Sequence, residues 1–396
     1  HMKSIYFFLI VNICSSLFSK AQTNQLDFQA HHKDDITVLE YSPDGKYIVS
    51  GSWDESIIIQ RNDSSQEVVQ RIHDNKGAIT SISFRRDGFH MITGGQDGKL
   101  NIYQFNDSFF SVATLDTTLL VNQCQINKLI YGPGMRTIFS AGDDGRFIAF
   151  DLTRNQIIPI KTSRPISAAG VSIDRMSYFI AHENKTEIVQ YDIMGRKLKS
   201  YLGHTDQITD ILVTIDRKHI ISSSEDKTVR IWDIRSGKEL FSFKDHRWTV
   251  TDIATDPHGK YLVSGSLDGT VNLYNLKDKE LIKSYNLEGY KINALAFSPN
   301  YTKIAVAAQK NETSEFAGYF LLETDLKYRA VKLPKRYKLK KQPKQMKSNS
   351  ATKNQTPPSI KRINNASKVG INLNKTKPKS TEKVIKKTDQ IEIRID

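Results

Sequence analysis

Histidine, serine and aspartate occur together twice in this chain: His204, Ser222 and Asp226, and again His246, Ser264 and Asp268. These three residue types form the catalytic triad of many hydrolases, in which histidine deprotonates the serine and aspartate orients the histidine. An active site needs one copy, however, whereas this trio returns in register with a longer repeat. We therefore interpret both sets as structural and expect no catalytic residue in the chain.

Other signatures of catalysis or metal binding are missing from the sequence. It has no CxxC pair, no HExxH, no glycine-rich phosphate loop and no GxSxG. The adjacent pair His31-His32 is interpreted as part of an exposed loop, and acidic turns such as Asp143-Asp144 are ordinary in strand hairpins. We expect no metal and no cofactor.

A recurring block predicts the elements that position these side chains. Its first apolar residue returns at spacings between 40 and 47 residues: Ile36, Ile79, Ile126, Ile166, Ile208, Val250 and Ile292. An acidic turn, seen at Asp54 and Asp97, keeps the same step. Each block contains three clear strand-forming runs and a weaker fourth. Seven such units predict an all-β fold over residues 25–333, a seven-bladed β-propeller of four-stranded antiparallel blades.

The units resemble WD repeats. The fifth has the fullest signature, because Gly203-His204 opens it and Trp232-Asp233 closes its third strand. The sixth has Asp245-His246 and Tyr274-Asn275, and the third ends its strand with Phe150-Asp151. The second, third, fourth and seventh units are degenerate. The resemblance implies a binding scaffold rather than an enzyme.

In the WD-repeat family a buried network joins the loop histidine, a hydroxyl of the second strand, the turn aspartate and the strand tryptophan. The resemblance implies these members here: His204, Ser222 or Ser224, Asp226 and Trp232 in the fifth unit, and His246, Ser264 or Ser266, and Asp268 in the sixth. Buried polar groups are costly unless each finds a partner, and this set satisfies itself within one blade.

Closing a ring of blades requires a segment shared between the first and last units. Residues 25–31 resemble the fourth strand and following loop of a unit, so we expect Leu26–Phe28 to supply the outer strand of blade seven. Tyr328–Leu333 is the competing segment for the same role.

Recognition is expected on one rim of the disc. Trp53 precedes a turn aspartate, Trp248 precedes a first strand, and in the WD family loops of these two kinds open on the same rim. Blades six, seven and one become neighbours on closure, and aromatic residues beside cations are typical of binding hot spots. The predicted patch consists of Trp53, Arg247, Trp248, Leu267, Tyr290 and Lys291. The alternative is that each ring packs on its own blade.

The two ends of the chain differ from the repeats. Residues 1–21 are interpreted as a signal peptide, with Lys3 before the apolar run Ile5–Phe18 and a cleavage site before Gln22. His1 looks like a cloning remnant, and an uncleaved anchor is the alternative. Residues 334–396 contain 18 Lys or Arg and 4 Asp or Glu, which accounts for the whole net charge of +14. This tail is expected to be disordered.

We therefore expect an exported, monomeric, non-catalytic scaffold, periplasmic or secreted, that binds a protein partner through its rim. Its polycationic tail would tether it to a partner or to an anionic surface such as an envelope polymer. Nucleic acid is disfavoured, because Tyr337 is the only aromatic residue of the tail. A propeller enzyme of the lyase or hydrolase kind is one alternative, and would need acidic residues or histidines converging on the channel mouth. A module that binds envelope glycans through the same rim is the other.

Overall fold

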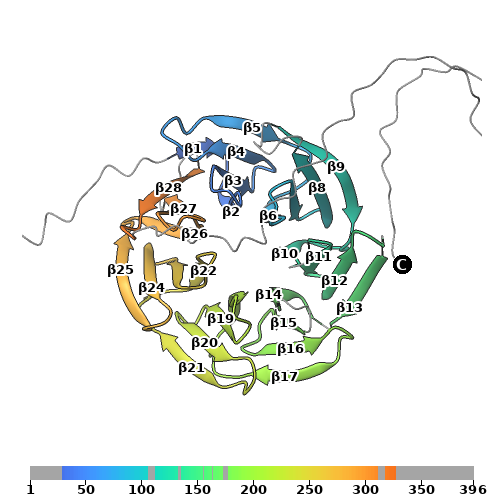
Figure 1. Cartoon of the computed structure of the whole chain (residues 1–396), viewed down its shortest axis with the longest axis vertical. Coiled ribbons are helices and arrows are strands. Elements are labelled where there is room, and N and C mark those ends of the chain that lie inside the picture. The colour runs from blue at the N-terminus through green and yellow to red at the C-terminus, as the bar shows by residue number, and fades with distance from the viewer. Residues whose placement is uncertain are drawn as a thin grey trace, which may run out of the picture. The chain divides into compact units, whose positions relative to one another are not determined.

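The computed structural model describes residues 29–105, 112–132, 135–154, 156–162, 164–172, 177–310 and 317–326. Every regular element in these ranges is a β-strand. No helix long and apolar enough to cross a membrane occurs among these residues. The strands form seven four-stranded antiparallel sheets arranged as blades of a ring (Figure 1). The predicted seven-bladed propeller is confirmed.

Each blade has an inner strand, two middle strands and an outer strand. In that order, the first three blades contain β2 (Ile36–Tyr41), β3 (Tyr47–Ser52), β4 (Ile57–Arg61) and β5 (Val68–Ile72); β6 (Ile79–Phe84), β7 (His90–Gly95), β8 (Lys99–Phe105) and β9 (Ala113–Leu120); β10 (Ile126–Tyr131), β11 (Thr137–Gly142), β12 (Arg146–Asp151) and β13 (Gln156–Lys161). The next three contain β14 (Ile166–Val171), β15 (Ser177–His182), β16 (Ile188–Asp192) and β17 (Lys197–Tyr201); β18 (Ile208–Val213), β19 (His219–Ser224), β20 (Val229–Asp233) and β21 (Glu239–Phe243); β22 (Val250–Thr255), β23 (Tyr261–Ser266), β24 (Thr270–Asn275) and β25 (Glu280–Asn286). Blade seven contains β26 (Tyr290–Phe297), β27 (Lys303–Lys310), β28 (Ala317–Glu323) and β1 (Gln29–His32).

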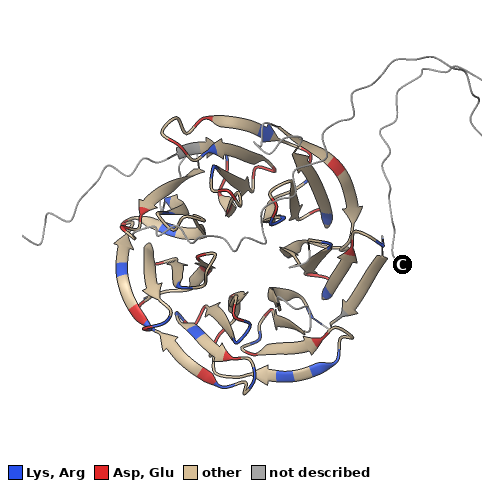
Figure 2. Cartoon of the chain, in the orientation of Figure 1, with Lys and Arg blue, Asp and Glu red and all other residues tan. Residues whose placement is uncertain are grey.

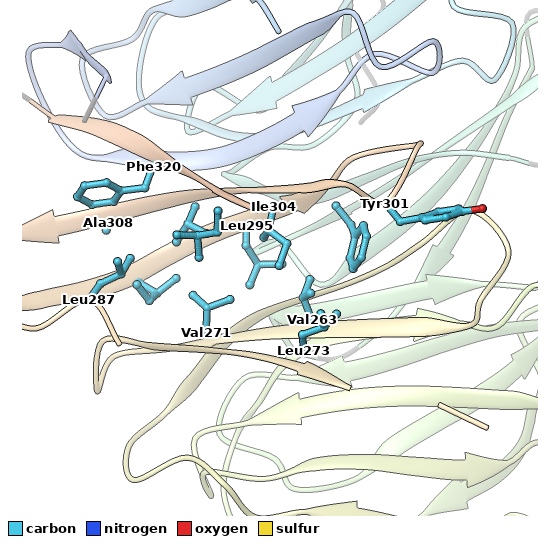
Figure 3. Packing of buried hydrophobic residues seen from close by; sticks show 13 residues of the cluster. Val263, Val271, Leu273, Leu287, Leu295, Tyr301, Ile304, Ala308 and Phe320 are labelled. Carbon is cyan, nitrogen blue, oxygen red and sulfur yellow. The ribbon is translucent and has the colours of Figure 1, made fainter. Parts of the chain in front are cut away.

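The hydrophobic core lies between the blades. Seven clusters of buried residues occur in the described chain, and each joins two neighbouring blades. Figure 3 shows the cluster between blades six and seven, where Val263 and Leu273 face Leu295 and Ile304. Second strands such as β3, β11 and β15 are buried along their whole length because a blade packs on each of their faces. This packing holds the loops at the ends of the strands in fixed positions.

A β-bulge recurs at one point in all seven inner strands, where the register shifts just after the first apolar residue. The bulged residue is polar in every blade and can therefore reach across to the next one. Thr209 Oγ1 donates to the Val250 carbonyl at 2.6 Å, and Thr251 Oγ1 donates to the Ile292 carbonyl at 2.9 Å. Asn127 does the same through its amide. These bonds set the spacing of consecutive inner strands around the axis.

The ring closes between blades seven and one through the N-terminal segment. β1 pairs with β28, with Gln29 opposite Tyr319, and the Tyr319 hydroxyl donates to Gln60 Oε1 of blade one at 2.8 Å. Strand exchange from the N-terminal side is thus the device the sequence predicted. The strand described is Gln29–His32; the expected Leu26–Phe28 and the competing Tyr328–Leu333 lie outside the described residues.

Charges of both signs are interspersed around the ring (Figure 2). This agrees with the even balance of Lys and Arg against Asp and Glu over residues 1–333. The predicted signal peptide, residues 1–21, and the predicted basic tail, residues 334–396, lie outside the described residues.

Candidate functional site

Two kinds of loop meet at one end of every blade, and together we call them the upper rim. They are the loop before each inner strand and the turn between the second and third strands. In blade one, Ile36 at the start of β2 pairs with Ser52 at the end of β3, and the Trp53 N–H donates to the Asp35 carbonyl at 3.0 Å. In blade six the Leu267 N–H donates to the Thr249 carbonyl. The other loops form the lower rim, at the opposite ends of the strands.

Below the upper rim of blade five lies a closed hydrogen-bond network. His204 Nδ1 is 2.7 Å from Asp226 Oδ2, and His204 Nε2 is 2.7 Å from Ser222 Oγ. Trp232 Nε1 donates to the same Ser222 Oγ at 2.9 Å. Trp232 is 0% exposed and fills the space beside the histidine ring. Of the two serines that the resemblance allowed, Ser222 is the one in the network.

The partners of His204 determine how the protons are arranged. Asp226 can only accept at this short distance, so Nδ1 of His204 carries the proton and Nε2 accepts the hydroxyl hydrogen of Ser222. Ser222 in turn accepts from Trp232, which leaves every polar atom of the four side chains satisfied. Both His204 and Ser222 are buried, so no substrate reaches the hydroxyl. The trio has the bonds of a catalytic triad without its access, and its role is structural.

Blade six repeats the network with a substitution. His246 Nε2 is 2.6 Å from Ser264 Oγ, as in blade five. Its Nδ1 bonds to Thr270 Oγ1 at 2.8 Å, whereas Asp268 Oδ2 is 3.8 Å away. Thr270 donates to Asp268, so the hydroxyl bridges the histidine and the aspartate.

Blade one contains a third copy, which corrects our interpretation of His31-His32. His32 is buried rather than exposed, with Nε2 2.7 Å from Ser50 Oγ and Nδ1 near Asp54 and Ser56. The signal was present in the sequence, because His32 lies four positions before Ile36 just as His204 lies four positions before Ile208. The segment that we compared with the fourth strand and following loop of a unit, residues 25–31, ends one residue before this histidine.

The same position in blade three is occupied by asparagine, which the sequence reasoning missed. Asn122 Nδ2 donates to Asp144 Oδ1 at 2.9 Å, and Ser140 Oγ donates to Asn122 Oδ1 at 2.8 Å. Asn122 also stands four residues before the inner strand, at Ile126. The amide reproduces the donor and acceptor of a neutral imidazole, so the network persists without histidine.

Three of the turn aspartates, Asp54, Asp226 and Asp268, are held ionised by these bonds. Burial alone would raise the pKa of Asp226, but hydrogen bonds from His204, Thr228 and the Thr205 N–H outweigh it and lower the pKa well below its usual value. Asp54 and Asp268 behave alike, with the pKa of each lowered against burial by its histidine and a neighbouring hydroxyl. Each aspartate therefore anchors the rim as a charged acceptor.

Each turn aspartate also fixes the backbone of the rim itself. The Arg247 N–H donates to Asp268 at 2.6 Å, the Lys33 N–H to Asp54 at 2.8 Å, and the Gln123 N–H to Asp144 at 2.8 Å. In blade six this bond holds the backbone directly before Trp248, one of the candidate recognition residues. The rim is a rigid surface for this reason.

The two rim tryptophans project into solvent. Trp53 is 49% exposed and Trp248 is 54% exposed, although an indole of this size is usually largely buried. Arg247 is exposed beside Trp248, and Leu267 is half-buried in the adjoining turn of blade six. Blade seven separates the two blades that carry the tryptophans (Figure 1).

Tyr290 and Lys291 stand on the same rim in blade seven but differ from the tryptophans. The Tyr290 ring is half-buried and meets the Phe320 ring edge-on, with 5.1 Å between centroids. It packs on its own blade, as the alternative interpretation held. Lys291 is exposed. Of the predicted patch, the exposed side chains are therefore Trp53, Trp248, Arg247 and Lys291.

Four charged residues of the inner strands form a second group near the axis, which we call the axial cluster: Glu40, Lys128, Asp210 and Asp252. Lys128 Nζ of blade three is 2.7 Å from Asp210 Oδ1 of blade five. Because blade four stands between them, their side chains meet on the axial side of its inner strand. The repeat pattern did not predict this convergence of acidic residues, which is the feature that an enzyme would have required.

Two of the axial carboxyl groups, Glu40 and Asp252, have a raised pKa. Burial raises the pKa of Glu40 to about 7, in spite of an opposing effect of Lys128. Burial and the neighbouring Asp210 raise the pKa of Asp252 to about 7. Burial would lower the pKa of Lys128, but Asp210, Asp252 and Glu40 outweigh it and raise the pKa. No group of three metal-ligating side chains lies close enough for a metal ion among the described residues.

Comparison with known proteins agrees with this geometry. The family model described as "WD domain, G-beta repeat" (WD40) matches residues 22–59, 66–104, 195–233 and 237–275, which correspond to blades one, two, five and six. The second unit, which we treated as degenerate, is therefore recognised. Ribosomal RNA-processing protein 9 of Saccharomyces cerevisiae (strain ATCC 204508 / S288c) is 33% identical over 76 residues. That match covers 19% of this chain and 13% of the relative.

Seven four-stranded antiparallel blades form the ring, and in four of them a histidine or asparagine bonds to a turn aspartate at the upper rim, directly or through a hydroxyl. Four of the seven units match the WD40 repeat model, so this chain is a seven-bladed β-propeller that contains WD40 repeats.

The role of Trp232 can be tested by substitution. Trp232→Ala empties a large core site and removes the donor to Ser222, so we expect a loss of ~3–5 kcal/mol in the free energy of unfolding. Trp232→Phe keeps most of the packing and loses mainly the hydrogen bond, at about 1 kcal/mol. Urea unfolding followed by fluorescence or circular dichroism measures both. Equal stability of the Ala variant and the parent would contradict the core position.

Adjacent histidines provide a matched pair for the network of blade one. His32→Ala leaves the buried Ser50 hydroxyl without its partner and removes one of the donors to Asp54, so we expect a loss of ~2 kcal/mol or more. His31→Ala should change stability by less than about 0.5 kcal/mol, because its side chain takes no part in the network. Thermal unfolding of the two variants side by side gives the comparison. A larger loss of stability in His31→Ala than in His32→Ala would place His31, and not His32, in the network.

Proposed function

We propose that this protein is an exported, non-catalytic scaffold that binds a protein partner through the upper rim. Propellers of the WD40 type are commonly protein-interaction scaffolds. The observation that carries the proposal is the exposure of two tryptophans, Trp53 and Trp248, on one rim held rigid by turn aspartates. Exposed indole surface is unfavourable in water and is typical of an interface that a partner covers.

Cations complete the character of the proposed interface. Arg247 is exposed next to Trp248 in the chain, and Lys291 is exposed in blade seven, between the two blades that carry the tryptophans. The partner should therefore present apolar pockets flanked by carboxylates. Arginine beside tryptophan is the composition that hot spots favour. An envelope glycan is the competing ligand, since sugars also stack on exposed aromatic rings.

The rim proposal predicts a selective loss of binding. Trp53→Ala/Trp248→Ala should fold like the parent, because both side chains are half exposed. Loss of one hot-spot residue costs ~2 kcal/mol of binding free energy, so we expect the double variant to bind on the order of 30-fold more weakly or worse. Affinity capture from the native envelope fraction, quantified by mass spectrometry against protein and polysaccharide pools, measures the loss.

The matched control lies on the lower rim. Ile215→Ala/Met194→Ala removes exposed apolar surface from turns at the opposite ends of the strands. This variant should keep full binding. Loss of the partner in the control, with retention in the tryptophan variant, would place the interface on the lower rim. Retention of a polysaccharide instead of a protein would favour the glycan module.

Export and tethering form the second half of the proposal. Its support is the sequence of residues 1–21, with a lysine before an apolar run and small residues at a cleavage point, and the 18 cations of residues 334–396. The tail would hold the disc near an anionic polymer or surface. When the chain is expressed in its native host, the mature N-terminus read by mass spectrometry should be Gln22. A protein that begins at Met2 would contradict cleavage.

A further inference from the structure

Charge in the axial cluster is not required to build the ring. Lys128, Asp210 and Asp252 all stand just after the bulge of an inner strand. In the other four blades that position holds an uncharged residue: Val38, Ser81, Ala168 and Ala294. The seven inner strands nevertheless share the same bulge and the same pairing. Three blades therefore carry a charge at this position for a reason other than closure.

The charges of the cluster do not balance. Three carboxyl groups share one ammonium, and Lys128 is placed against Asp210, at 2.7 Å. No other cation forms an ion pair with these carboxyl groups within the described ranges. The Lys128 side chain keeps 30% of its surface exposed, so solvent and a ligand can reach the group.

One buried oxygen of the cluster has no partner among the described residues. Asp210 is 3% exposed, and its Oδ2 accepts no hydrogen bond from that part of the chain. At the matching position in blade two, Ser81 Oγ accepts the N–H of Leu129 in the next blade. The equivalent donor for Asp210 would be the N–H of Ile253 in the next blade. That N–H donates instead to Asp252 at 2.9 Å. An unsatisfied, buried carboxylate oxygen is costly unless a donor arrives.

We propose that the axial cluster binds a cationic side chain, the ammonium of lysine or the guanidinium of arginine, presented by an extended basic segment. A donor with several N–H groups suits carboxylates that come from three different blades. A compact metal ion suits them less, because no three metal-ligating groups of the described chain converge closely enough. The site is distinct from the upper rim, and its test does not use the rim partner.

Two sources can supply that chemistry. One is this chain's own residues 334–396, which contain 18 Lys or Arg. The other is a basic segment of a separate protein. The ligand chemistry is the same in both cases, so a single probe tests the site and a truncated chain distinguishes the sources.

The binding should depend on pH in a defined direction. Glu40 is influenced by Lys128 and Asp252, and Asp252 by Asp210 and Lys128; both carboxyl groups have a pKa of about 7. A cation binds the ionised forms, so affinity should rise with pH. Between pH 6 and pH 8 we expect a gain of about tenfold for each carboxyl group that contributes.

The probe is a fluorescein-labelled peptide with the sequence of residues 335–341, KRYKLKK, followed by anisotropy at physiological salt. The control peptide has acetylated lysines and citrulline in place of arginine. Glu40→Gln/Asp252→Asn should weaken probe binding at pH 8 at least tenfold and remove the pH dependence. Glu67→Gln/Glu280→Gln, which neutralises two exposed carboxylates, should change it less than twofold.

Lys128→Met separates binding from folding. It removes the competing ammonium, so the probe should bind more tightly at pH 8, whereas a purely structural cluster would give only a lower melting temperature. Truncation after residue 334 removes the tail. Tighter probe binding in the truncated chain indicates the chain's own tail as ligand, and equal binding indicates a separate partner. The proposal is overturned if neither chain binds the probe, if the neutral peptide binds equally, or if the axial variant behaves like its surface control.

Discussion

The bond from the turn aspartate to the loop before the inner strand is the constraint on which the rest of this propeller depends. That loop connects the outer strand of one blade to the inner strand of the next, so fixing it fixes consecutive blades against each other. Asp54, Asp144, Asp226 and Asp268 each accept both a backbone N–H of the loop and, directly or through a hydroxyl, a side chain four residues before the inner strand. Apolar packing between blades is non-directional and would allow one blade to shift against the next. Hydrogen bonds from several fixed donors to one charged acceptor are directional and prevent such a shift.

Blades four and seven show how the ring manages without that aspartate. In blade four, Nδ1 of His182 at the end of β15 donates to the carbonyls of Arg164 and Pro165. The turn is again bonded to the loop, but here the turn residue is the donor, whereas the turn aspartate of the other blades is the acceptor. In blade seven, the histidine position is taken by exposed Glu288. The neighbouring junction with blade one relies on a tightly packed cluster rich in alanine and on the bond from Tyr319 to Gln60. Blades four and seven, whose repeats depart from the sequence signature, thus have other contacts in place of the aspartate bond. These contacts follow no motif that can be recognised in the sequence.

Sequence reasoning reached the fold because two markers with independent causes agreed. The first apolar residue of each block must be buried between blades, and the turn must reverse the chain; both kept the same step from Ile36 to Ile292. It misplaced His32 because a one-residue slip in a short, irregular segment changes which side chain faces inward. It missed the axial cluster because a bulge interrupts the alternation of faces, so the inward direction of Asp210 cannot be read from a simple period of two.

Two sets of carboxyl groups act on the stability of this propeller in opposite directions. Asp54, Asp226 and Asp268 have a folded-state pKa below the unfolded value, so their stabilisation is present above that value and is lost as the pH falls. Glu40 and Asp252 have a folded-state pKa of about 7, above the unfolded value, so their contribution is full in acid and is lost as the pH rises through 7. At neutral pH the rim is therefore at its most stable while the axis holds partly ionised carboxyl groups at a cost. A cation that enters the axis offsets that cost and stabilises the ionised forms, which couples occupancy of the axis to the stability of the whole ring.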